Sequence, residues 1–237
     1  MRALFVQQDH VSPVGPVGEQ FAARGYDVEE FLVVPADRFH LPDVAVEFPD
    51  PTTYDAIVPM GAPWSVYDEA TIGAWVLEEL TFLRRAHEAG IPVLGICFGG
   101  QALAAALGGS VERAAEAEVG WVTIESDDPG LVESGPWFEW HHDRWTPPPG
   151  AVSLARTSVS DQAFRIGRSL AVQFHPEITP SQLQAWIDNG GKDFLVAHAV
   201  DPAALVAETV RTADDAQTRT RRLVDNFLDQ VATAAVG

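Results

Sequence analysis

Short apolar runs alternate along the first half of the chain with stretches whose apolar residues recur at helical spacing. Apolar runs of this length and composition predict strands, and the helical spacing between them predicts helices. Strand and helix in regular alternation are typical of βαβ units and of a largely parallel sheet. The predicted strands are residues 3–6, 28–33, 54–59 and 92–96, and the predicted helices are residues 18–24, 70–89 and 100–107.

The pattern changes after residue 110, where short apolar runs follow one another with tight turns between them. Such runs favour mixed or antiparallel pairing, added at one side of the parallel core. Helices are predicted again at 181–187 and, beyond a break at Gly190 and Gly191, over 201–231, with an interruption at 212–220. The short strands predicted in this half are residues 119–125, 138–140, 152–157, 163–166 and 170–174.

The chain shows neither an internal repeat nor a low-complexity linker, so we expect one domain over residues 1–190, with 191–237 as its C-terminal helical extension. The 237 residues carry 34 acidic and 15 basic side chains, a net charge of −19. That charge repels phosphate backbones and anionic lipid, which argues against nucleic-acid and membrane partners. A single cysteine excludes an internal disulfide and a Cys-rich zinc site. No signal peptide or apolar run of membrane-spanning length is visible, so we expect a cytoplasmic protein.

The strongest local signal is the segment Gly-Ile-Cys-Phe-Gly-Gly-Gln at residues 95–101, between an apolar strand and an apolar helix. A Gly-x-nucleophile-x-Gly turn at such a junction is a nucleophile elbow. Gly95 and Gly99 remove the Cβ atoms that would clash in so sharp a turn. The Cys97 thiol then points out above the carboxyl ends of the strands, and the helix N-terminus stabilises its thiolate. A lone cysteine is usually a buried structural residue, but this setting favours a nucleophile.

A thiolate used for acyl transfer needs a base, and the base needs an orienting group. The segment Phe-His-Pro-Glu at 174–177 directly follows an apolar strand. Positions i and i+2 of an extended segment point to the same side, so Glu177 is placed to hold the second ring nitrogen of His175. We therefore interpret His175 as the base and Glu177 as its orienting carboxylate.

These two segments together resemble the class I (triad) glutamine amidotransferases. Three further motifs are similar to the branch that contains the amidotransferase domain of GMP synthase, and the resemblance extends from residue 1 to about residue 190. It implies a three-layer α/β sandwich, flavodoxin-like, with a mainly parallel central sheet and added antiparallel strands. The motifs are Met-Gly-Ala-Pro-Trp-Ser-Val-Tyr-Asp at 60–68, Glu-Val-Gly-Trp at 118–121 and Trp-His-His-Asp-Arg-Trp at 140–145.

The resemblance also implies a chemistry. Cys97 would attack the side-chain amide of glutamine to give a γ-glutamyl thioester and ammonia, with His175 moving the protons and Glu177 orienting it. The oxyanion would be held by the backbone N–H of Phe98 and by an N–H of the Gly61-Ala62 turn. The glutamine pocket would be lined by Gln101, Gly120, Trp121 and His141.

Two positions leave alternatives open. The family loop commonly has a glycine where this chain has Ala62, so either the turn is strained until substrate or a partner binds, or it accommodates alanine without strain. His141 and His142 next to Asp143 suggest a metal site. Adjacent strand residues face opposite ways and no further ligand cluster accompanies them, so we favour a pocket role for His141 and no metal.

The chain contains no Gly-rich phosphate loop, and 191–237 is too short for the synthetase half of GMP synthase. We therefore expect a freestanding glutaminase that supplies ammonia to a separate synthetase subunit and needs no cofactor. One alternative is a hydrolase of γ-glutamyl peptides or conjugates that uses the same triad. Another is a non-catalytic regulatory module, against which the intact triad argues.

Overall fold

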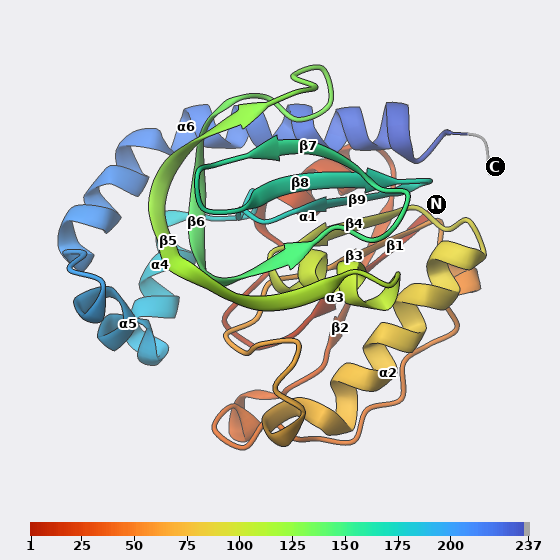
Figure 1. Ribbon diagram of the computed structural model, residues 1–237, viewed down its shortest axis with the longest axis horizontal. Coiled ribbons are helices and arrows are strands. Elements are labelled where there is room, and N and C mark those ends of the chain that lie inside the picture. Colours follow the sequence, from red (N-terminus) through yellow and green to blue (C-terminus); the bar gives the residue numbers. More distant parts are fainter. Residues whose placement is uncertain (235–237) are drawn as a thin grey trace.

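The computed structural model of the protein describes residues 1–234, and within them nine strands form one sheet in the order β2-β1-β3-β4-β9-β8-β7-β5-β6 (Figure 1). Each neighbouring pair among the first five of these strands is parallel. The parallel core predicted from the alternating pattern is therefore confirmed. Its strands are β1 (Arg2–Gln7), β2 (Asp27–Leu32), β3 (Ala56–Pro59), β4 (Val93–Ile96) and β9 (Ser169–Val172).

The remaining four strands pair antiparallel and extend the sheet beyond β9, on one side of the core as predicted. Two of them form a long curved ribbon, which is far longer than the runs 119–125 and 138–140 that the sequence suggested (Figure 1). The strand β6 was predicted too short because its inward positions Glu139, His141 and Asp143 are polar. They are buried where the strand pattern leads one to expect apolar residues. The four antiparallel strands are β5 (Ser110–Ser126), β6 (Gly135–Thr146), β7 (Val152–Arg156) and β8 (Asp161–Ile166), and the long ribbon is formed by β5 and β6.

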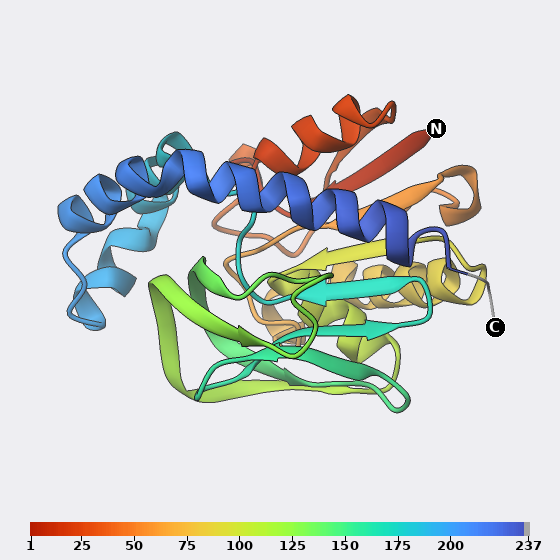
Figure 2. The same cartoon turned by 90° about the horizontal axis from the view of Figure 1, so that it is seen from above.

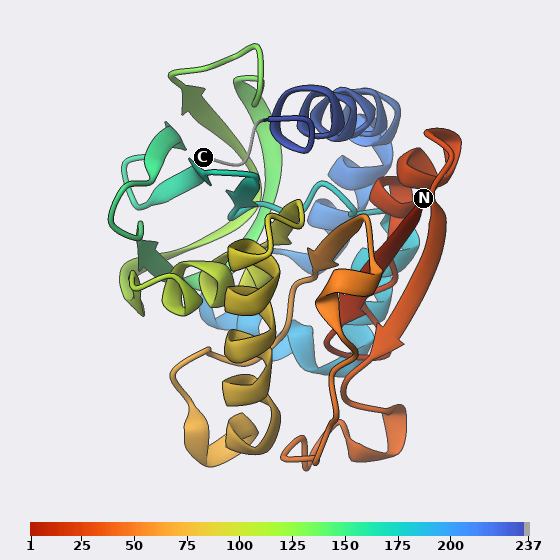
Figure 3. The same ribbon diagram turned by 90° about the vertical axis from the view of Figure 1, so that its right-hand side faces the viewer.

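Helices cover both faces of the parallel core, which gives the predicted three-layer α/β sandwich. The helices α1 (Gly15–Ala23) and α6 (Pro202–Asn226) pack together on one face, and α2 (Glu69–Glu88) and α3 (Phe98–Ala106) pack on the other (Figures 2 and 3). Alternate residues of β1 serve the two layers: Phe5 lies in the apolar cluster with α1 and α6, and Leu4 in the cluster with α2 and α3.

The C-terminal helix α6 is continuous, so the interruption predicted at 212–220 is wrong. Its threonines suggested a break, but they are satisfied without one. The hydroxyls of Thr212 and Thr218 donate to the carbonyl oxygens four residues earlier, and that of Thr220 donates to Pro176 O at 2.7 Å. The last contact ties α6 to the segment that follows β9.

The helix α4 (Pro180–Trp186) continues through an irregular turn at Ile187–Gly191 into a short helix, α5 (Lys192–Ala197), which the sequence did not predict. The break predicted at Gly190 and Gly191 is present as a kink, in which Asn189 and Gly190 are non-helical and Gly190 takes a left-handed conformation, with φ +107°. No helix of the described residues is both long and apolar enough to cross a membrane. The remaining short helical turns are Ala36–Arg38, Pro51–Thr53 and Phe227–Val231.

Candidate active site

Cys97 occupies the sharp turn between β4 and α3. Its backbone has φ +49° and ψ −110°, one of two non-glycine residues with positive φ in residues 1–234. Such a conformation costs about 1–3 kcal/mol and is typical of functional turns. A Cβ added to Gly99 would collide with the carbonyl oxygen of Pro59, and one added to Gly95 would lie 2.8 Å from Gly100 Cα. The structure thus has the strand, glycine turn and helix that the sequence predicted.

His175 follows β9 and is paired with Glu177 in a buried position. Its Nδ1 lies 2.8 Å from Glu177 Oε1, and its Nε2 has no hydrogen-bond partner among the described residues. Burial lowers the pKa of His175, but the negative charges of the Cys97 thiolate and Glu177 raise it more, so it lies well above the usual histidine range. The imidazole therefore holds a proton strongly whenever the cysteine is ionised.

Three chain segments converge at this point, each leaving the carboxyl end of one of the adjacent strands β3, β4 and β9. A Cβ placed on Gly61 would lie 2.9 Å from His175 Cε1 and 3.7 Å from Cys97 Cβ. Ala62 has no positive φ, so the turn accommodates alanine without left-handed strain. Phe98 is the first residue of α3, where a backbone N–H has no intrahelical partner.

A cavity of about 470 Å³ opens over these groups. Its lining includes Cys97 and His175 and four of the residues predicted to bind substrate: Gly61, Ala62, Gln101 and His141. The lining also includes five Phe and Trp rings, those of Phe39, Trp64, Trp140, Trp186 and Phe194.

Gly120 and Trp121 lie elsewhere, against α6, and are not part of the cavity lining. A Cβ on Gly120 would lie 3.3 Å from Leu205 Cδ1. The indole N–H of Trp121 donates to Thr209 Oγ1 at 3.1 Å. The structure therefore does not bring these two residues together with the other predicted pocket residues.

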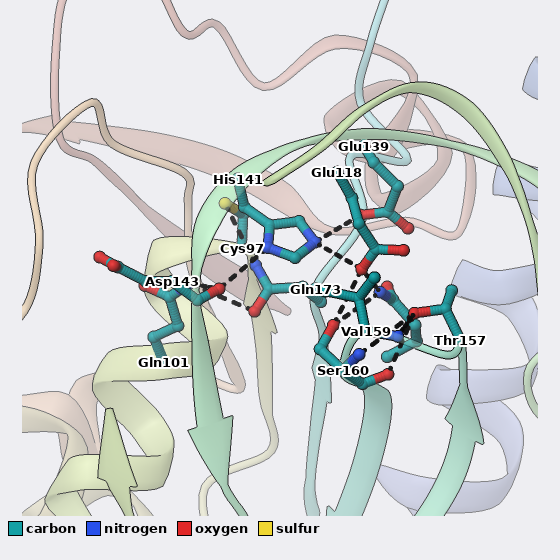
Figure 4. A network of polar contacts seen from close by, with 11 residues as sticks. Cys97, Gln101, Glu118, Glu139, His141, Asp143, Thr157, Val159, Ser160 and Gln173 are labelled. Carbon is teal, nitrogen blue, oxygen red and sulfur yellow. Dashed lines mark hydrogen bonds and ion pairs between the residues drawn. The ribbon is translucent and has the colours of Figure 1, made fainter. Parts of the chain in front are cut away.

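Gln173 is a polar neighbour of the sulfur that the sequence analysis did not identify (Figure 4). Its Nε2 donates to Cys97 Sγ at 3.6 Å, and its Oε1 accepts from Gln101 Nε2 at 3.2 Å. Gln101 Nε2 also donates to the carbonyl oxygen of Asp143 at 3.3 Å. The position of Gln173, two residues before His175 in an extended segment, was the available signal.

His141 lies beside this network, and its Nε2 faces two buried carboxylates (Figure 4). Its Nε2 is 3.2 Å from Glu118 Oε2 and 3.3 Å from Glu139 Oε2, and its Nδ1 is 2.9 Å from Asp143 O. Burial lowers the pKa of His141, but Glu118 and Glu139 raise it more, to about 10. Neither carboxylate was identified from the sequence, although a charged residue at an inward strand position is a recognisable signal.

The amino-acid sequence matches one protein-family model and several curated proteins. The family model "Glutamine amidotransferase class-I" matches residues 21–193. The glutamine-hydrolyzing GMP synthase of Parafrankia sp. is 36% identical over 136 residues, which are 54% of this chain and 24% of that protein. That of Lactobacillus delbrueckii subsp. bulgaricus is 34% identical over 190 residues, 76% of this chain and 33% of that protein. The chain thus spans a quarter to a third of the length of these relatives.

Solved structures share the fold over nearly the whole chain. A glutamine amidotransferase from Thermotoga maritima has a TM-score of 0.82 at 24% identity and covers 97% of this chain and 99% of its own. One from Methylobacillus flagellatus has a TM-score of 0.82 at 22% identity and covers 97% of this chain and 95% of its own. This likeness confirms the predicted flavodoxin-like α/β fold. Because the family model covers more than half of the residues, the protein belongs to the class I glutamine amidotransferase family.

Proposed function

We propose that this protein hydrolyses the side-chain amide of glutamine through a thioester on Cys97, releasing glutamate and ammonia. The observation that supports the proposal best is the convergence of Gly61, Cys97 and His175 in the lining of one cavity, with Glu177 held against His175. Nucleophile, base and orienting carboxylate in this arrangement are what acyl transfer by a thiolate requires.

The proposed steps assign one role to each of these groups. The unpartnered Nε2 of His175 takes the thiol proton, and the sulfur attacks the amide carbon. The N–H of Phe98 and an N–H of the 61–62 turn stabilise the oxyanion. His175 then protonates the leaving nitrogen, which departs as ammonia, and afterwards takes a proton from the water that hydrolyses the thioester. Glu177 keeps the Nδ1 proton in place throughout.

The substrate would lie along the wall that carries Gln101 and His141. Gln101 is held by Gln173 and by the Asp143 carbonyl, so its side-chain oxygen remains available to a ligand. For Gly120 and Trp121 we propose an indirect part, because they hold β5 against α6.

We further propose that the ammonia passes to a separate synthetase subunit. The matching GMP synthases hydrolyse glutamine, as their names state, and this chain corresponds to only part of their length. A protein that co-purifies with the chain and raises its glutamine turnover would identify the acceptor.

Glutamate release from glutamine by the purified protein tests the hydrolysis itself. We expect steady turnover in the wild type and none above background in Cys97→Ala. A rate that is equal in both proteins would contradict the proposal, because it would assign the activity to another residue or to a contaminant.

A second candidate is the hydrolysis of γ-glutamyl peptides or conjugates. The cavity volume of about 470 Å³ lies within the range of about 300–1,000 Å³ typical of pockets for drug-sized ligands, and its aromatic walls suit a leaving group larger than ammonia. The ratio of kcat/KM for γ-glutamyl dipeptides to that for glutamine separates the two. A ratio well above one favours the conjugate hydrolase.

A further inference from the structure

The ribbon β5–β6 carries a stripe of charged residues on its buried face, next to the candidate nucleophile. Glu118 and His141 are directly opposite each other in the strand register, and Glu139 lies two residues before His141, on the same face. All three are buried. Burying charged groups is costly unless they are paired, so this position calls for a reason other than packing.

The contacts of His141 fix where its protons are. Asp143 O is a carbonyl and only accepts hydrogen bonds, so the neighbouring Nδ1 carries a proton. Nε2 faces the carboxylates of Glu118 and Glu139 at 3.2 and 3.3 Å, so it carries a second one. The ring is then an imidazolium whose Nδ1–H donates to Asp143 O and whose Nε2 lies within ion-pair distance of both carboxylates.

Glu118 is the better anchored of the two carboxylates. Its Oε2 accepts from Ser160 Oγ at 3.0 Å (Figure 4) and from Gln162 Nε2 at 2.9 Å. Both oxygens of Glu139 lack a hydrogen-bond partner among the described residues, and its Oε2 lies 3.3 Å from the imidazolium. Glu118 therefore suffices to hold the charge of His141. Burial raises the pKa of Glu139 and the neighbouring His141 lowers it by less, so the negative charge of Glu139 depends on the imidazolium.

His141 also lies within electrostatic range of the sulfur. Cys97 and His141 line the same cavity, and the Cys97 thiolate contributes to raising the pKa of His141, after the larger effects of burial, Glu118 and Glu139. The interaction is reciprocal, so a fixed imidazolium favours the thiolate. His175 cannot provide a constant charge, because it gives up its proton in each proposed cycle.

We propose that His141, kept as a permanent imidazolium by Glu118 and Glu139, is a positioning residue whose charge stabilises the Cys97 thiolate. The inference rests on the proposed role of Cys97 as nucleophile and deepens it. His141 acts through its field and does not touch the reacting atoms, because its Nδ1–H donates to Asp143 O and its Nε2 faces the two carboxylates. The ionisable groups around it, from every element that packs against it, are Cys97, Glu118, Glu139, His142, Asp143 and His175.

The pH dependence of Cys97 alkylation by iodoacetamide tests this charge without glutamine turnover, so it can fail or succeed independently of the proposed function. The variant is His141→Asn, because the asparagine amide keeps a donor for Asp143 O and removes the charge. We expect the alkylation midpoint to rise by about 1 to 3 pH units, the usual effect of losing an adjacent opposite charge. Alkylation at neutral pH should slow about tenfold or more.

Glu139→Gln is the matched control. It removes an anion near the sulfur and leaves Glu118 to hold the imidazolium, so we expect an unchanged or lower midpoint. Opposite effects of two substitutions in one cluster are not expected from a general loss of structure. The proposal is overturned if His141→Asn keeps the wild-type midpoint, or if Glu139→Gln raises it as much as His141→Asn does.

A measurement on the wild-type chain keeps the proposal testable even if His141→Asn does not fold. Nitrogen-15 NMR of histidine-labelled protein at about pH 8.5, below the value of about 10 expected for His141, reports its protonation directly. Two protonated ring nitrogens on His141 support the proposal. A neutral tautomer at this pH overturns it.

Discussion

Gly61→Ala inserts one methyl group between the candidate nucleophile and its base. The added carbon would lie 2.9 Å from His175 Cε1, whereas non-bonded carbons rest about 3.5–4.0 Å apart, so the ring or the turn must move by roughly 0.6 Å or more. The ring has little freedom, because Glu177 holds its Nδ1 at 2.8 Å and the Trp186 ring lies against it at 4.9 Å. A misplacement of about 1 Å costs about 100-fold, so we expect kcat to fall about 10- to 100-fold.

The assay is glutamine hydrolysis measured beside urea unfolding. We expect Gly61→Ala to remain folded and to lose about 1–3 kcal/mol of unfolding free energy through overpacking. The matched control is Gly73→Ala in α2, whose Cβ would make an ordinary contact of 3.6 Å with Glu69 Cβ. It should keep its kcat and gain about 0.5–1 kcal/mol. A folded Gly61→Ala protein with wild-type kcat would refute the proposed convergence of Gly61, Cys97 and His175.

Three further substitutions give distinct expectations. Glu177→Gln removes the charge that holds His175 Nδ1, so kcat should fall about 100-fold or more; a wild-type rate of glutamate release would count against the orienting role. Burial raises the pKa of Glu79 to about 8 from 4.5. Stability is then lost as pH rises from 4.5 toward 8, because only the unfolded chain ionises freely. Glu79→Gln should therefore have the unfolding free energy of the wild type at pH 4.5 and exceed it by about 3 kcal/mol at about pH 7. Equal differences between the two proteins in urea unfolding at both pH values would contradict the raised pKa of Glu79. The pKa of His141 is raised from 6.5 to about 10 in the folded protein. Its protonation therefore increases the free energy of unfolding, and this contribution is fully present below pH 6.5 and is lost as pH rises to about 10. The loss amounts to about 5 kcal/mol, or less if Glu139 takes up a proton. In the Glu79→Gln background, His141→Asn should flatten the fall in unfolding free energy over this pH range, and an unchanged slope would contradict the assignment.

The sequence predicted the parallel core because its information there is local. The strands β1, β3 and β4 are buried on both faces, so they appear as continuous apolar runs ended by glycine or polar residues. The length of the ribbon β5–β6 was underestimated because its inward stripe is charged, so it lacks the apolar alternation that marks a half-buried strand. The threonines of α6 obscured a continuous helix for the same kind of reason, since only the folded chain shows which acceptors they use.

In the candidate site, too, the sequence predicted the features that depend on neighbouring residues and missed those that depend on distant ones. The turn at Cys97 and the His175–Glu177 pair are short-range patterns, and the sequence alone located both. Nothing local indicated that Gly120 and Trp121 face α6, because that depends on how a distant helix packs. The pairing of Glu118 with His141 required the register of two strands, although both residues stood in motifs that the sequence had singled out.

The most direct test is the reaction of the protein with the diazo-ketone analogue of glutamine, followed by intact-mass spectrometry and peptide mapping. Labelling requires an activated sulfur and a glutamine-shaped pocket in the same place, and it does not depend on an ammonia acceptor. We predict a single adduct on Cys97, with glutamine protecting against it and Glu177→Gln slowing it. An unmodified Cys97 under conditions that keep the protein folded would contradict the proposed active site.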